Sequence, residues 1–235
     1  METFDLVPAP HTIAGIDAAW TGLAAPGSWF EGAERVDIAR ETRLARDCSL
    51  CGERKTALSP YSAGGEHESA LVDAVHRITT DPGRLTEKWY SEATGAGLLP
   101  EQVVEIAGII GVVTIADTLA HALGQPVRDL PSPQPGEPSR QHVHGAVVGG
   151  GWVPMVATDQ AEGPLRLIYD QMNQAAGFVF NVLRALTAVP EAVQGFFAAF
   201  APNYHTHGPV GTGGLTRPQV ELMASSTSAI NDCFY

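Results

Sequence analysis

Hydrophobic positions follow helical spacing through most of the chain, and no convincing alternating strands are found. The clearest segment begins at Pro100, a favourable first helical position, and stays apolar on nearly all sides until Gly124 ends it. We expect such a helix to be buried. Further helices are predicted over residues 31–47, 68–79, 84–96, 164–172, 178–188, 191–200 and 216–230. The pattern therefore predicts an all-α protein.

A stretch rich in proline and glycine divides these helices into two groups. It spans residues 125–164 and has the composition of a linker. Residues 1–27 are interpreted as an N-terminal extension, residues 28–124 as a complete helical unit, and residues 165–235 as an incomplete second unit. A faint internal repeat supports this division, because an Asp-Cys pair occurs at Asp47-Cys48 and again at Asp232-Cys233.

Composition narrows the class of protein. The 235 residues carry a net charge of -12, which disfavours nucleic acid and anionic membrane surfaces as partners. The longest nearly uninterrupted apolar run, residues 106–116, is shorter than the roughly 20 residues that a membrane-spanning helix needs. The N-terminus has no features of a secretory signal, so we expect a cytoplasmic protein. Three cysteines cannot form a closed secretory disulfide framework.

Two of the three cysteines, Cys48 and Cys51, form a C-x-x-C pair. On a helix this spacing places both side chains on one face. If Asp47 caps the N-terminus of that helix, the unpaired amide groups and the helix dipole favour a thiolate. A redox-active pair is the favoured interpretation.

Two other interpretations of the pair stay open. A single C-x-x-C is half of a zinc site, which His67 or His76 could complete, but the spacing is not that of a zinc finger. We therefore rank zinc behind redox chemistry and expect no metal or cofactor. Alternatively, both cysteines are small buried side chains in a helix packing seam.

The C-terminal pattern of Glu221, eleven residues and Cys233 resembles the signature Glu-x11-Cys-x2-Cys-x3-His of the alkylhydroperoxidase D-like, or carboxymuconolactone decarboxylase, superfamily. The segment RDCSLCGERKTALSPY resembles the two-domain alkylhydroperoxidase-related branch of that superfamily. The segment VEIAGIIGVVTIADTLAHALG resembles the closing helix of its fold. The resemblance implies an all-helical fold, with one complete unit in residues 28–124 and the first half of another in residues 165–235.

The resemblance also implies roles for the first motif. Cys51 would attack a hydroperoxide or exchange with a partner's disulfide, and Cys48 would resolve the product. The sequence departs from the family pattern where a relay of protons is expected: Lys55 stands at the position of the histidine, and the register of the acid falls on Val36, one residue before Asp37. The first motif is therefore expected to lack a full relay.

In the second motif Glu221 and Cys233 fit the signature, and the given sequence stops at Tyr235, one residue before the second cysteine is expected. One hypothesis is that the next codon is a UGA for selenocysteine, since the superfamily includes selenoproteins. The nucleotide sequence after codon 235 tests it.

The resulting functional prediction is a thiol-dependent peroxidase or disulfide reductase with Cys51, Cys48, Cys233 and Glu221 as catalytic residues. Its expected partners are a hydroperoxide, a thiol or disulfide electron-donor protein and further copies of the chain, with no nucleic acid or membrane. One alternative is a decarboxylase acting on a small cyclic carboxylate. The other is a helical oligomerisation protein without enzymatic activity.

Overall fold

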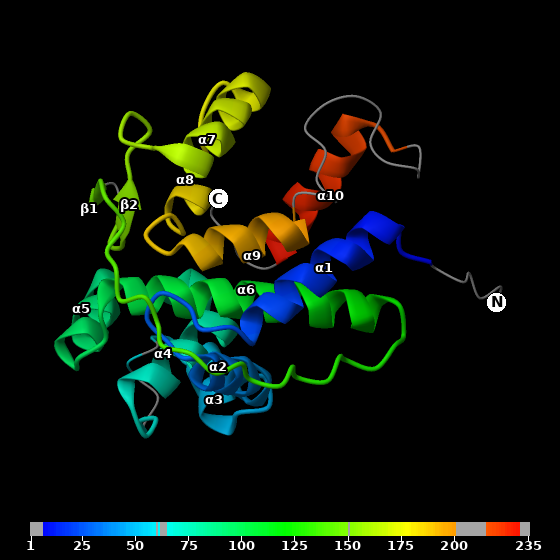
Figure 1. The fold of residues 1–235 in the computed structure, drawn as a ribbon. Coiled ribbons are helices and arrows are strands. Elements are labelled where there is room, and N and C mark those ends of the chain that lie inside the picture. Colours follow the sequence, from blue (N-terminus) through cyan, green and yellow to red (C-terminus); the bar gives the residue numbers. More distant parts are fainter. Residues whose placement is uncertain (1–6, 60, 62–64, 150, 201–214, 231–235) are drawn as a thin grey trace, which may run out of the picture.

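The structure is a computed structural model, and it describes residues 7–59, 61, 65–149, 151–200 and 215–230. Within these residues the protein is mostly helical, which confirms the predicted all-α class (Figure 1). The helices are α1 (Pro10–Leu23), α2 (Gly32–Ala45), α3 (Ser49–Thr56), α4 (Ala70–Thr80), α5 (Glu87–Gly95), α6 (Pro100–Ala122), α7 (Gly163–Ala176), α8 (Asn181–Arg184), α9 (Pro190–Phe200) and α10 (Arg217–Ile230). A short 3-10 helix, Pro82–Arg84, precedes α5.

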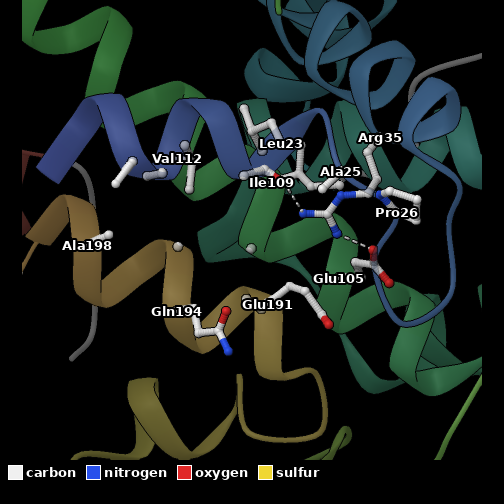
Figure 2. A pocket seen from close by; sticks show the side chains of 16 residues that line it. Leu23, Ala25, Pro26, Arg35, Glu105, Ile109, Val112, Glu191, Gln194 and Ala198 are labelled. Carbon is white, nitrogen blue, oxygen red and sulfur yellow. Dashed lines mark hydrogen bonds and ion pairs between the residues drawn. The ribbon is translucent and has the colours of Figure 1, made fainter. Parts of the chain in front are cut away.

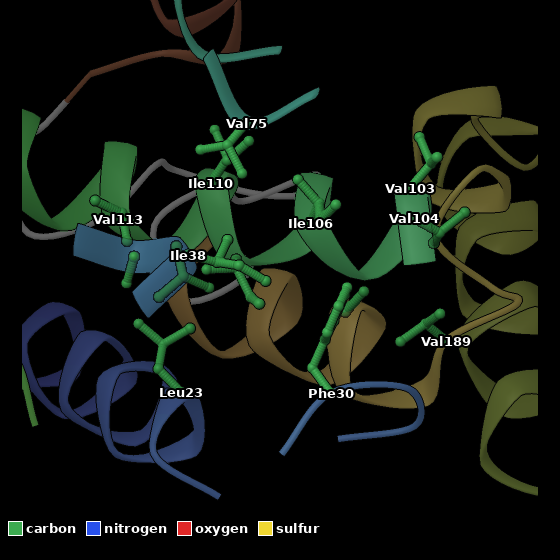
Figure 3. Packing of buried hydrophobic residues seen from close by; sticks show 14 of the residues in the cluster. Leu23, Phe30, Ile38, Val75, Val103, Val104, Ile106, Ile110, Val113 and Val189 are labelled. Atoms are coloured by element: carbon green, nitrogen blue, oxygen red, sulfur yellow. The ribbon is translucent and has the colours of Figure 1, made fainter. Parts of the chain in front are cut away.

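Helix α6 is the centre of the main hydrophobic core. It packs against α1, α2, α4 and α9, and its apolar side chains project toward these helices in several directions (Figure 3). Ile106 and Val113 are completely buried. By length and composition α6 could cross a membrane, but 61% of its most apolar 18-residue stretch lies inside the protein. This is the burial of a core helix, as its all-round apolar surface predicts.

Helix α1 occupies the segment that we interpreted as an N-terminal extension. Pro10 opens it, and Ile16, Trp20 and Leu23 are buried in the main core. The helix packs mainly against α9 and also contacts α6. Helix α1 therefore builds the core together with a helix that follows about 170 positions later.

The segment predicted as a linker contains a small antiparallel hairpin of β1 (Ala146–Val148) and β2 (Pro154–Val156). Strand β2 is buried in a second hydrophobic cluster with α7, α8 and α9. Tyr169 donates its hydroxyl hydrogen to the carbonyl of Val156 at 3.0 Å, and the amide of Val156 donates to Thr187 Oγ1 at 2.9 Å. Helix α9 contributes side chains to both clusters and so joins them.

Three helix boundaries agree closely with their sequence signals. Helix α6 ends at Ala122, and Gly124 adopts a φ of 63° just beyond it. At the start of α10, predicted to begin at residue 216, the amide of Thr216 donates to Gln219 Oε1 at 2.7 Å in a capping contact. Ser69 caps α4 by accepting a hydrogen bond from the amide of Val72. Helix α8 is shorter than the helix predicted over residues 178–188.

Buried ion pairs fix α2 against α6. Arg35 on α2 pairs with Glu105 on α6, and both side chains are almost fully buried. At the other end of α2, Arg43 and Arg46 both bind Asp117, whose side chain is 2% exposed. These contacts hold the middle of α2, including Glu41, in a defined place beside α4.

Candidate functional site

The C-x-x-C pair lies at the first turn of α3. Cys48 is the N-cap residue and Cys51 the third residue of the helix. The expectation that Asp47 caps this helix is wrong, because the Asp47 amide donates to the carbonyl of Leu44 at 3.2 Å and continues the turn that ends α2. Cys51 is 3% exposed and Cys48 is half-buried, and both are free thiols.

A histidine and a glutamate from two other helices extend from Cys51. His76, in the middle of α4, places Nδ1 3.1 Å from Cys51 Sγ. Its other ring nitrogen, Nε2, lies 2.6 Å from Glu41 Oε1 on α2. With Nε2–H donated to the carboxylate, Nδ1 can accept the proton of the Cys51 thiol. The three groups have the order of a nucleophile, a base and the group that orients the base.

A second histidine closes the group. His67, in the segment before α4, has Nε2 3.8 Å from Cys51 Sγ, and its ring centroid is 4.0 Å from that of His76. One donor atom from each of Cys48, Cys51, His67 and His76 lies within 4.8 Å of the other three. Residues from α3, α4 and the segment between them therefore meet at one point.

Burial dominates the electrostatics of this group. It raises the pKa of the Cys51 thiol to about 11, and the neighbouring Cys48 thiol adds to the increase. A hydrogen bond with Thr80 and the charge of Arg54 act in the opposite direction but do not compensate. The helix N-terminus, which we expected to favour a thiolate, does not overcome burial. Burial and the adjacent His76 also lower the pKa of His67, which favours its neutral form.

The residues at the expected family positions do not form the relay. Lys55 is exposed on α3. Asp37 is also exposed and pairs with Arg40 instead of approaching a cysteine. Instead, His76 lies next to Cys51 and Glu41 lies next to His76, at positions that the family pattern does not predict. The sequence showed His76 only as a possible zinc ligand and gave no signal for Glu41.

The predicted second site is described only in part. Glu221 lies near the start of α10, and α10 and α3 lie on opposite sides of α6 in Figure 1. Cys233 lies outside the described residues. The structure therefore places Glu221 apart from the Cys48–Cys51 pair.

A pocket of about 460 Å³ opens beside His67. Arg77 lines this pocket, is 5% exposed and has two buried guanidinium nitrogens, Nε and Nη2, that no described residue binds. Tyr61 lies near the Arg77 guanidinium, 5.8 Å from it to the ring centroid. The pocket gives a small molecule a place close to the cysteine–histidine group.

A separate cavity of about 320 Å³ lies between α1, α6 and α9 (Figure 2). Arg35, Glu105 and Glu191 supply its charged groups, and small apolar side chains supply most of the rest. Burial raises the pKa of Glu105, although Arg35 and the amide of Trp29 stabilise its charged form. Neither Cys48 nor Cys51 lines this cavity, and the ion pair of Arg35 with Glu105 forms part of its wall.

Comparisons of the chain with protein-family models, curated proteins and solved structures find no match. The fold and the site define an all-α protein in which a buried cysteine and a buried histidine lie beside a partly exposed glutamate and a second cysteine.

Proposed function

We propose that this protein is a thiol-dependent peroxidase or disulfide reductase whose centre is the Cys48–Cys51 pair. One observation carries the proposal: Cys51 Sγ is 3.1 Å from His76 Nδ1, and His76 Nε2 is 2.6 Å from Glu41. A buried thiol with a pKa of about 11 is almost entirely protonated at neutral pH, so its reaction as a nucleophile needs a base in contact with it. His76 is that base, and Glu41 positions it.

The proposed reaction starts when the Cys51 thiol transfers its proton to His76 Nδ1. The thiolate attacks the terminal oxygen of a hydroperoxide, the O–O bond breaks, and His76 returns the proton to the departing alkoxide, which leaves as an alcohol. Cys51 is now a sulfenic acid. The Cys48 thiol attacks its sulfur, water leaves, and a Cys48–Cys51 disulfide forms. A dithiol donor then reduces this disulfide and is itself oxidised to a disulfide.

The positions of the two thiols suit these roles. Cys51 touches the base, and Cys48 is the more exposed of the two, so a donor protein reaches Cys48 first when it reduces the disulfide. The pair occupies the N-cap and third positions of one helix, and the two sulfurs lie within 4.8 Å of each other. The side chains must then move together before a disulfide of about 2.0 Å can form.

The test is consumption of cumene hydroperoxide by the reduced, metal-free protein with dithiothreitol as donor. Cys51→Ser is expected to abolish turnover, and His76→Gln to lower kcat/KM by about 10²- to 10⁴-fold, the usual contribution of a general base. The control His142→Gln removes an exposed histidine that binds Glu101 far from the cysteines in the sequence, and it should react like the parent. Full turnover in Cys51→Ser would refute the proposal.

A further inference from the structure

The four donor atoms around Cys51 have the dimensions of a small tetrahedral metal site. In a zinc site with bonds of about 2.0 to 2.3 Å, neighbouring ligand atoms are about 3.3 to 3.8 Å apart. Here the four atoms lie within 4.8 Å of one another, with Cys51 Sγ 3.1 Å from His76 Nδ1 and 3.8 Å from His67 Nε2. An edge of 4.8 Å would have to shorten by about 1 Å to reach the length found in a tetrahedral zinc site.

The donor set selects the metal. Two thiolates and two imidazoles are the ligands of tetrahedral zinc sites, and the two thiolate charges balance those of Zn²⁺. Arg54, which is 8% exposed and lies on α3 three residues after Cys51, adds a positive charge that favours the Cys51 thiolate. Four protein donors also leave no open position, so such a site holds its metal without activating water.

Glu41 supports the same assignment. A histidine that binds zinc commonly donates its second ring N–H to a carboxylate, which fixes the tautomer and aims the other nitrogen at the metal. His76 does this through Nε2, 2.6 Å from Glu41 Oε1, and turns Nδ1 toward the cysteine sulfurs. The side chain of Glu41 is 28% exposed, and that of His76 is only 6% exposed.

We infer that the reduced protein binds one Zn²⁺ through Cys48 Sγ, Cys51 Sγ, His67 Nε2 and His76 Nδ1, with Glu41 orienting His76. The bound ion occupies both thiolates and the base, so it holds the site in a form that does not react with hydroperoxide. Oxidation to the Cys48–Cys51 disulfide removes both sulfur ligands, and the disulfide form cannot hold the ion. The inhibition of peroxide chemistry by bound zinc rests on the proposed function, whereas zinc binding itself does not.

The test uses the full chain, reduced and treated with a chelator, and titrates it with Co²⁺ and then with Zn²⁺. One equivalent of Co²⁺ should give the visible bands of a tetrahedral ion and a thiolate-to-metal charge-transfer band, and Zn²⁺ should displace it. Cys51→Ser and His67→Ala should lose this spectrum, and Glu41→Gln should weaken binding about 10- to 100-fold. His142→Gln should bind as the parent does.

The oxidised parent provides a test without mutation, which matters if a variant fails to fold. The disulfide form should bind no metal, and Zn²⁺ should protect Cys48 and Cys51 of the reduced parent from alkylation by N-ethylmaleimide. Absence of one-equivalent binding, or binding that survives in the disulfide form, would overturn the inference. Peroxide turnover in the metal-free parent is measured separately. Zinc binding without turnover would support the zinc site and refute the proposed function. Turnover without zinc binding would support the proposed function and refute the zinc site.

Discussion

The close contact between α6 and α9 predicts that two glycines of α6, Gly108 and Gly111, tolerate alanine differently. A Cβ added at Gly108 would lie 2.6 Å from Ala192 Cβ and 3.0 Å from Ala192 Cα, on α9. Carbon atoms in contact prefer about 3.5 to 4.0 Å, so the two helices would have to separate by about 1 Å. A Cβ added at Gly111, about one turn later, meets no atom of the described residues within 4 Å.

The two alanine variants should therefore change stability in different ways. Both gain about 1 kcal/mol of helix propensity over glycine. Gly108→Ala also incurs an overpacking cost of about 1 to 3 kcal/mol, because the atoms it meets include backbone. We expect Gly111→Ala to raise the free energy of unfolding by about 0.5 to 1 kcal/mol, and Gly108→Ala to be about 1 to 3 kcal/mol less stable than Gly111→Ala.

Urea unfolding followed by circular dichroism measures this difference, provided that the slope of the transition is unchanged. The double variant Gly108→Ala with Ala192→Gly removes the closer of the two contacts and should recover part of the loss, with a coupling of about 0.5 kcal/mol or more. Equal effects of Gly108→Ala and Gly111→Ala, or an additive double variant, would refute the packing of α9 on α6.

Two further predictions concern charged side chains. Glu105→Gln leaves Arg35 buried without a counterion and should lower the free energy of unfolding by about 3 to 5 kcal/mol. As a control, Asp37→Asn breaks an exposed pair and should change it by less than about 1 kcal/mol. Similar losses for the two variants in chemical denaturation would contradict the burial of the Arg35–Glu105 pair. Glu41→Gln should lower kcat/KM for hydroperoxide, because Glu41 orients His76. Glu53 is exposed on α3, so Glu53→Gln should not change kcat/KM. Parental kinetics in Glu41→Gln would show that Glu41 has no part in the reaction.

Helices with strong local sequence signals could be predicted, and elements that depend on distant contacts could not. Helix α6 was predicted nearly to its ends because Pro100, the apolar run and Gly124 are local signals that agree with its burial. Helix α1 was not predicted, since its apolar face has meaning only against α9, far away in the sequence. The three-residue strands of the hairpin lie in a segment rich in proline and glycine, and no period can be read over so few positions.

For the site, the spacing of Cys48 and Cys51 identified the pair, and the rest depended on tertiary packing. The register of the family pattern falls on Val36, one residue before Asp37, but the carboxylate that reaches His76 belongs to Glu41, about one helical turn after Asp37 on α2. His76 is 25 residues from Cys51, and only the packing of α4 against α2 and α3 brings the three groups together. The ion pairs of α2 with α6 fix that arrangement, and no local pattern encodes them.

The most direct test of the Cys51–His76–Glu41 centre is a single turnover of the reduced, metal-free protein with one equivalent of cumene hydroperoxide, followed by peptide mass spectrometry. We expect a Cys48–Cys51 disulfide that forms in the parent and in His142→Gln, and forms at least about 100-fold more slowly in His76→Gln. Cysteines that stay reduced, or a disulfide that forms at the parental rate in His76→Gln, would contradict the role of this centre.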